Sequence, residues 1–279
     1  MIDLRMLFPG GAFKALTISY DDGVEQDERL LAILNAHGLK CTFNLNSGLF
    51  APEGKTWQPG EVQRRLSLEA AKKLYLPTEH EIAVHACMHG DLPNLPPAHA
   101  LWQVVKDREV LETEFDRIIR GAVYPFGTLS DTLAETLQNC GMAYARTTVT
   151  TETFEVPSNW LKWDPTCRHR NPRLMELARQ FVEARAFRPQ LFYVWGHAYE
   201  FEMDDNWQVM EDFAAYVGGR EDIWYATNIE VCDYVTAWRN MHISCDGSRI
   251  YNPSAIPLWI RVNRKTYRID PGCHWQAEA

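Results

Sequence analysis

Two pairs of side chains in the sequence have the types and spacing that metal-dependent chemistry requires. Asp21 and Asp22 are adjacent and directly follow the apolar run 15–20. Neighbouring side chains on a strand point to opposite faces, so one carboxylate can bind a metal ion while the other faces a substrate. His85 and His89 are four residues apart, which allows both imidazoles to reach one ion. Two histidines and a carboxylate suit zinc, iron, nickel or cobalt and leave coordination positions open, as a catalytic site requires.

A third histidine follows another apolar run and adds an acid to this set. His197 comes just after residues 191–195, where it is placed to give a proton to a leaving group. The turn 124–127 could direct backbone N–H groups at a developing oxyanion. The candidate residues for oxyanion stabilisation and substrate contact are Tyr124, Pro125, Phe126, Gly127, Arg146, Trp163, Asp164, Trp195, Tyr199 and Glu200. Taken alone, each motif also has a structural reading: a helix-capping turn, a β-turn, a core histidine or packed tryptophans. Their combination favours a site.

The elements that must position these residues alternate between short β-rich runs and helical stretches. Seven strands are predicted, over residues 15–20, 40–44, 81–86, 122–124, 143–149, 191–195 and 223–227. Helices are predicted around 30–34 and over 68–75, 98–120, 131–140, 172–186 and 207–217. This alternation is typical of a parallel sheet with helical crossovers, whose ligands bind at the carboxyl ends of the strands.

The last part of the chain has a different pattern. From Met241 onward the sequence consists of short β-like pieces separated by turn residues. We therefore expect a large α/β domain over 1–240 and a small β appendage over 241–279 that packs on it.

Composition excludes several classes of protein. The chain has 279 residues, of which 46% are hydrophobic and 23% charged, as in an ordinary globular protein. A net charge of −9 argues against nucleic acid as a partner, and no apolar run is long enough to span a membrane. Seven scattered cysteines without a Cys-x-x-Cys pair are typical of free thiols in a reducing compartment, and no secretory signal is visible. We expect a cytoplasmic protein.

The order and spacing of the motifs resemble the polysaccharide deacetylase family, the NodB-homology carbohydrate esterases. Residues 19–23 are similar to the family's first motif, Thr-Phe-Asp-Asp-Gly. His85 and His89 match its His-(Ser/Thr)-x-x-His motif, and 195–197 match Leu-x-His. The resemblance covers roughly residues 14–230. It implies a distorted (β/α) barrel of about seven parallel strands, in agreement with the strand count.

The resemblance also implies a role for each matched residue. Asp21 is the expected catalytic base and His197 the expected general acid. Asp22, His85 and His89 are the expected ligands of one divalent metal ion, most simply zinc, with cobalt, nickel or iron as other options. The implied activity is removal of N- or O-linked acetyl groups from a carbohydrate by metal-activated water.

The sequence departs from the family pattern at several positions. The arginine that begins the third motif is absent, because that position holds Val123. Arg146, on the next predicted strand, is our candidate substitute as partner of the catalytic Asp. Ala86 replaces a Ser or Thr that would fix the second motif by a hydrogen bond. Trp163 and Asp164 match the fourth motif, which supports the acid, only loosely. The sequence around His197 resembles a divergent branch similar to the NodB-like domains found with gellan lyase.

Three alternatives remain at this stage. A hydrolase of cyclic amides or ureides, similar to the allantoinase-like branch, would use the same fold without the missing arginine. A catalytically silent carbohydrate-binding domain would use the tryptophan loop. An iron oxygenase would have the same ligand types, but the helical alternation argues against it.

Overall fold

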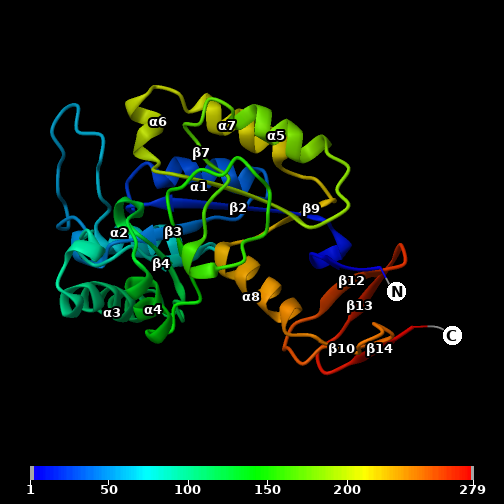
Figure 1. Ribbon diagram of the computed structural model, residues 1–279. Helices are drawn as coiled ribbons and strands as arrows, with labels where there is room; N and C mark the ends of the chain where they lie inside the picture. Colours follow the sequence, from blue (N-terminus) through cyan, green and yellow to red (C-terminus); the bar gives the residue numbers. More distant parts are fainter. Residues whose placement is uncertain (1–2, 278–279) are drawn as a thin grey trace.

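A curled parallel sheet forms the centre of the computed structural model, which describes residues 3–277 (Figure 1). Seven of its strands lie in the order β6-β5-β4-β3-β2-β8-β7, and β9 pairs with β2. The strands are β2 (Lys14–Asp21), β3 (Thr42–Leu45), β4 (Glu81–Val84), β5 (Gly121–Val123), β6 (Tyr144–Arg146), β7 (Cys167–Arg168), β8 (Gln190–Gly196) and β9 (Ile223–Tyr225). All pairings are parallel. The predicted NodB-like barrel is confirmed as a half-barrel.

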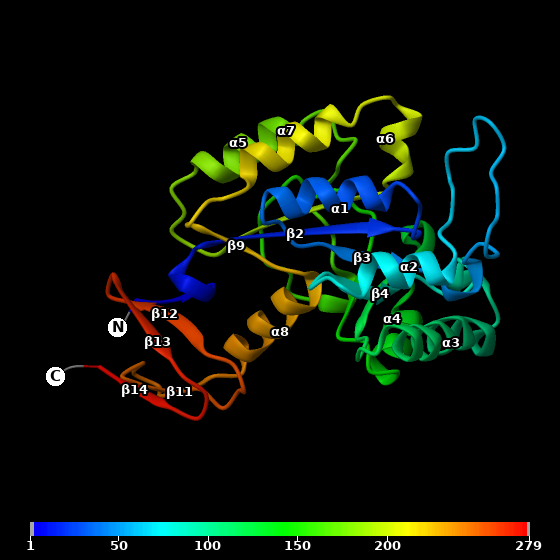
Figure 2. The same ribbon diagram turned by 180° about the vertical axis from the view of Figure 1, so that it is seen from behind.

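Helices lie on both sides of this sheet, and all except the last connect its strands along the chain. They are α1 (Asp27–Ala36), α2 (Leu68–Tyr75), α3 (Pro97–Phe115), α4 (Asp131–Asn139), α5 (Leu174–Glu183), α6 (Tyr199–Met203), α7 (Gln208–Val217) and α8 (Asn228–Arg239). Short 3-10 turns cover Pro9–Gly11, Ser47–Leu49, Leu92–Asn94, Pro125–Gly127 and Trp160–Lys162. In Figure 1, α5, α6 and α7 lie above the sheet, and α3 and α4 lie below it at the left; Figure 2 shows α1 along β2 from behind.

Local sequence explains where several of these elements begin and end. All eight residues of β2 are buried, as expected for a central strand covered on both faces. The side chains of Ser67 and Ser130 accept hydrogen bonds from backbone N–H groups at the starts of α2 and α4. A reciprocal capping box between Thr227 and Glu230 begins α8. Asp116 takes a left-handed conformation and ends α3 earlier than the predicted 98–120.

The C-terminal region forms two small antiparallel sheets below the barrel, drawn in orange and red in Figure 1. One has the order β1-β12-β13 and the other β10-β11-β14. Their strands are β1 (Leu4–Leu7), β10 (His242–Ile243), β11 (Arg249–Tyr251), β12 (Leu258–Val262), β13 (Lys265–Ile269) and β14 (His274–Gln276). The N-terminal strand therefore lies in the appendage, outside the boundary expected from the sequence alone.

Two hydrophobic cores hold these parts together. The larger fills the space between the sheet and its crossover helices. The second core joins the barrel to the C-terminal region. It contains Leu191 and Tyr193 of β8, residues of α8, and Leu258 and Ile260 of β12. Within residues 3–277, no helix combines the length and the apolar character needed to cross a bilayer.

Candidate metal and catalytic site

The carboxyl ends of neighbouring strands bring the predicted acids and histidines together. Asp21 ends β2 and Asp22 follows it, while His85 comes directly after β4 and His197 directly after β8. Because β2 lies beside β8, and β3 joins β2 to β4, these ends meet at one edge of the sheet. A cavity of about 860 Å³ is lined by these four residues and by His89.

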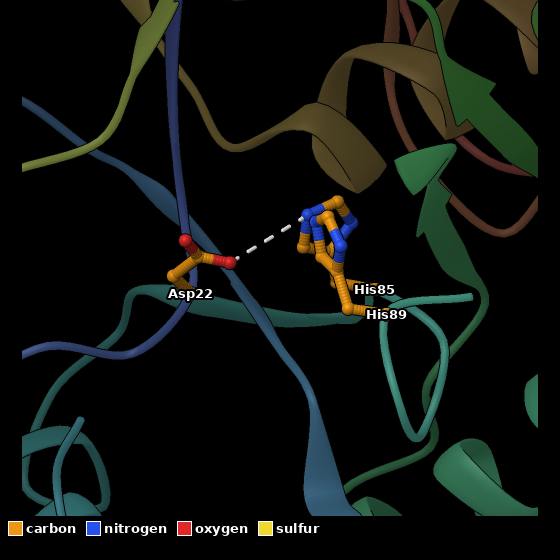
Figure 3. A group of neighbouring side chains, drawn as sticks. All are labelled: Asp22, His85 and His89. Atoms are coloured by element: carbon orange, nitrogen blue, oxygen red, sulfur yellow. Dashed lines mark ion pairs between the residues drawn. The ribbon is translucent and has the colours of Figure 1, made fainter. Parts of the chain in front are cut away.

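Three side chains in this cavity form a candidate metal site. One donor atom each from Asp22, His85 and His89 lies within 4.8 Å of the others. Figure 3 shows the Asp22 carboxylate facing the two imidazoles across an open space, with Asp22 Oδ1 3.9 Å from His85 Nε2. A carboxylate and two imidazoles are a donor set that zinc prefers.

The hydrogen bonds of His85 leave one ring nitrogen ready for a metal ion. Its Nδ1–H donates to the Val123 carbonyl at 3.1 Å, so Nε2 carries the lone pair. This Nε2 is buried and has no hydrogen-bond partner among the described residues. Burial lowers the pKa of His85 to about 4, so the ring is neutral near pH 7, as a ligand must be. An orphaned, buried acceptor facing a carboxylate fits a metal ion well.

Asp21 is buried and is held by two partners. Its Oδ2 accepts a hydrogen bond from Arg146 Nη2 at 2.6 Å, and its Oδ1 accepts one from Asn44 Nδ2 at 2.8 Å. Burial raises the pKa of Asp21, but Arg146, His85 and His197 outweigh it and the net pKa is lowered to about 2. Asp21 is therefore ionised at neutral pH. Arg146 occupies the position expected of a substitute for the missing arginine.

His197 lies on the other side of Asp21 and is flanked by a buried acid. Its Nε2 is 3.8 Å from Asp21 Oδ2, and its Nδ1 is 3.5 Å from Glu200 Oε2. Burial lowers the pKa of His197, but Glu200 and Asp21 outweigh this effect and the net pKa is raised. Arg168 also lies 3.1 Å from Nδ1. The raised pKa favours the arrangement in which Nδ1–H donates to Glu200 and Arg168 pairs with Glu200.

Two aromatic side chains line the cavity beside this pair. Trp195 is almost fully buried, and the guanidinium carbons of Arg146 and Arg168 lie 4.1 and 5.1 Å from its ring centroid. The ring of Tyr199 lies 5.2 Å from that of His197. Trp195 thus packs against both arginines that accompany the catalytic pair, at distances where a cation is attracted to an aromatic face.

The turn 124–127 leaves one backbone donor for an oxyanion. The N–H groups of Tyr124 and Gly127 donate to the carbonyls of Arg146 and Tyr124, and Pro125 has no N–H. Phe126 is the remaining candidate, and its side chain is exposed and lies edge-on to the His89 ring. The Tyr124 hydroxyl donates to the Leu161 carbonyl at 2.9 Å. Of the backbone N–H groups that the sequence suggested as oxyanion donors in this turn, Phe126 is therefore the one left without another acceptor among the described residues.

Comparison with known proteins concerns the family and the fold. A family model described as polysaccharide deacetylase matches residues 10–145. This part of the chain is similar to the polysaccharide deacetylase family. No curated protein matches the sequence.

Solved structures share the fold of this chain. A Mycobacterium smegmatis protein assigned as a polysaccharide deacetylase aligns with a TM-score of 0.63 at 16% identity, over 84% of this chain and 94% of that one. The chitin deacetylase of the fungal pathogen Colletotrichum lindemuthianum aligns with a TM-score of 0.53 at 17% identity, over 81% and 89%. The Streptococcus pyogenes deacetylase PplD in complex with acetate aligns with a TM-score of 0.44 at 18% identity. The alignment covers 52% of this chain and 61% of that one. The chain thus spans less than two thirds of that protein.

Three residues that the sequence suggested for substrate contact do not line the cavity of the site. Trp163 packs against Tyr144 and Tyr193, and Asp164 accepts a hydrogen bond from Thr147; both line a separate cavity. The expectation that they support the acid is wrong for the contacts seen here, because Glu200 and Arg168 take that place. Glu200, expected to contact substrate, is instead buried and paired.

Sequence reasoning missed several partners of the site. Asn44 and Asn46 stand at the end of β3, where the rule used for the other strands would have found them. Arg168 belongs to β7, which has two residues and leaves no periodic signal. Gln63 and Arg65 contact Asp22 from the long loop between β3 and α2, and no sequence pattern marks them.

Proposed function

We propose that the protein is a metal-dependent hydrolase that removes acetyl groups from an acetylated carbohydrate. The family and the fold support carbohydrate deacetylation. The single observation that carries the mechanism is the arrangement of Asp21 between Arg146 and His197, beside the Asp22, His85 and His89 group.

Asp22, His85 and His89 would hold the ion, and zinc is the ion that this donor set suits best. When bound, such an ion acts as a Lewis acid and makes a water molecule acidic near neutral pH. Because His85 is neutral near pH 7, it can bind a divalent cation without first losing a proton.

Asp21 and His197 divide the proton transfers. Asp21, ionised at neutral pH, accepts the proton of the attacking water. His197, whose pKa is raised, donates a proton to the departing amine or alcohol as the acyl C–N or C–O bond breaks. Water and the acetylated sugar thus become acetate and the free amine or hydroxyl group. The Phe126 N–H would stabilise the oxyanion, a contribution of about 3–4 kcal/mol for a donor of this kind.

A cyclic-amide hydrolase receives less support from this site. That alternative depended on the loss of the third-motif arginine, and Arg146 now supplies a guanidinium to the same aspartate. Product analysis separates the two activities, because only deacetylation releases acetate.

The test is acetate release from acetylated sugars by the protein loaded with zinc or cobalt, compared with Asp21→Asn. We expect the variant to retain bound metal and to lose turnover by roughly 10²–10⁴-fold, the contribution of a positioned base. Asp164→Asn is the matched control, since Asp164 is an exposed aspartate outside the cavity, and its activity should be unchanged. Full activity in Asp21→Asn would contradict the mechanism.

A further inference from the structure

The hydrogen bonds around the candidate metal ligands converge on two residues to which sequence reasoning gave no role. Asn46, just after β3, is 2% exposed, and its Nδ2 donates to the carbonyls of His85 and Ala86. Arg65 comes from the loop before α2, and its side chain is 15% exposed. Arg65 Nη1 donates to Asn46 Oδ1 at 2.7 Å, so the two residues form one unit.

This unit reaches the ligands on both neighbouring strands. Arg65 Nη2 donates to Asp22 Oδ1 at 3.0 Å, and Nη1 also donates to the Asp22 main-chain carbonyl. On the other side, the Ala86 carbonyl accepts a hydrogen bond from the N–H of His89 as well as from Asn46. A continuous set of hydrogen bonds therefore links Asp22 to His85 and His89.

The carbonyls that accept these hydrogen bonds include those of two residues with a strained backbone conformation. Asp22 has a φ of 88° and Ala86 a φ of 60°, values in the left-handed region that residues with a Cβ rarely adopt. Such conformations persist only when surrounding contacts fix them. Arg65 holds the carbonyl of Asp22, and Asn46 holds that of Ala86.

Arg65 is itself fixed, and it leaves room for an ion. Its backbone pairs with Val24, and Leu66 N–H donates to the Gly23 carbonyl at 2.9 Å. Gln63 Nε2 donates to Asp22 Oδ2 at 2.8 Å. A carboxylate has about four lone-pair positions, so two bonds fix its orientation and leave others for a metal ion.

We infer that Arg65 and Asn46 are positioning residues that hold the three metal ligands in their binding geometry. This inference rests on the proposed function, because it presumes that Asp22, His85 and His89 bind an ion. Partners of this kind typically change metal affinity by 10- to 100-fold when removed. Arg65 acts through both of its terminal nitrogens, one toward Asp22 and one toward Asn46, so charge alone does not replace it.

The test is the affinity of the metal-free full chain for Zn²⁺, measured by competition with a chromophoric chelator, together with the absorption spectrum of the Co²⁺ form. We expect Arg65→Gln to weaken Zn²⁺ binding by 10- to 100-fold and to alter the Co²⁺ spectrum. Arg65→Lys keeps the charge with a single nitrogen and should weaken binding similarly. Arg64→Gln is the matched control, because Arg64 pairs with Glu25 and Glu202 away from the ligands, and its affinity should equal that of the wild type.

Thermal unfolding of each metal-free variant checks that it is folded. Unchanged affinity in a folded Arg65→Gln, or full recovery in Arg65→Lys, would overturn the inference while the proposed function stands. Tighter binding would also overturn it and would show that Arg65 competes with the metal for Asp22. A wild-type protein that binds neither ion would refute the proposed function itself, and the inference with it.

Discussion

Asp21 experiences strong opposing effects of burial and of neighbouring charges. Its side chain is 2% exposed, which would favour the neutral acid, yet the guanidinium 2.6 Å away keeps it charged. A folded-state pKa of about 2, against 3.8 in the unfolded chain, contributes roughly 2 kcal/mol to stability. Because the folded pKa is the lower one, this contribution is complete above pH 3.8 and is lost as the pH falls toward 2.

Replacing Arg146 by methionine should reverse this balance. The variant leaves a buried carboxylate without its cation, which typically costs about 3–5 kcal/mol. The pKa of Asp21 should then rise, so the loss of stability relative to wild type should shrink as the pH is lowered and Asp21 takes up a proton. Urea unfolding at several pH values measures this. Arg29→Met, which removes an exposed pair with Glu211, should cost at most about 1 kcal/mol at any pH.

Glu200 should influence the pH above which activity is lost, because it raises the pKa of His197. Glu200 raises the pKa of His197, and His197 must be protonated to act as an acid, so activity falls as the pH rises through that pKa. Glu200→Gln removes the charge that raises the pKa of His197 and should therefore move this limb to lower pH. The pH dependence of kcat/KM for acetate release measures it. The exposed Glu176, paired with Arg173, gives a control in Glu176→Gln, whose profile should match the wild type. An unshifted limb in Glu200→Gln would contradict this role.

At the scale of elements, the close packing of β8 against β7 fixes the direction of His197. Gly196 precedes it, and a Cβ at this position would lie 1.9 Å from Nδ1 of His169. The His169 ring cannot move aside easily, because it is stacked on both Tyr20 and Phe201. A glycine is therefore required where the end of β8 passes His169, the residue that follows β7.

Gly196→Ala should destabilise the protein by about 1–3 kcal/mol through overpacking and should reduce turnover by displacing His197. A second substitution tests the cause. His169→Ala should remove the clash, so the double variant should lose less stability than the two single changes add up to. Chemical denaturation of the four proteins measures this coupling, and strictly additive losses would argue against the steric explanation.

The sequence predicted these elements unequally, for physical reasons. The seven predicted strands all exist, and most of their residues are buried. β7 was missed because two residues carry no periodicity, and with it Arg168 was missed. Arg146 of β6 was found because the third motif lacks its arginine and Arg146 is on the next predicted strand. Arg65 could not be found, since its place depends on the path of a loop.

At the scale of the whole molecule, the appendage and the barrel meet around α8. The strand β1 pairs with β12, so the chain reaches the barrel only after passing through the appendage. Tyr234 of α8 connects the two parts: its hydroxyl donates to the Leu7 carbonyl at 2.6 Å and accepts from Trp259 N–H at 2.9 Å. The shared core and these bonds indicate that the appendage folds together with the barrel rather than as an independent unit.

Tyr234→Phe tests this connection without touching the catalytic site. The substitution keeps the ring but leaves a buried carbonyl and a buried N–H without their partner, at about 1–3 kcal/mol for each unsatisfied group. We expect a lower free energy of unfolding, a single unfolding transition by tryptophan fluorescence and by far-UV circular dichroism, and an unchanged kcat for acetate release. Tyr267→Phe, in the partly exposed β13, is the control and should cost less. Two separate transitions would show instead that the appendage unfolds on its own. A lower kcat would show that the contact between the appendage and the barrel affects the catalytic site.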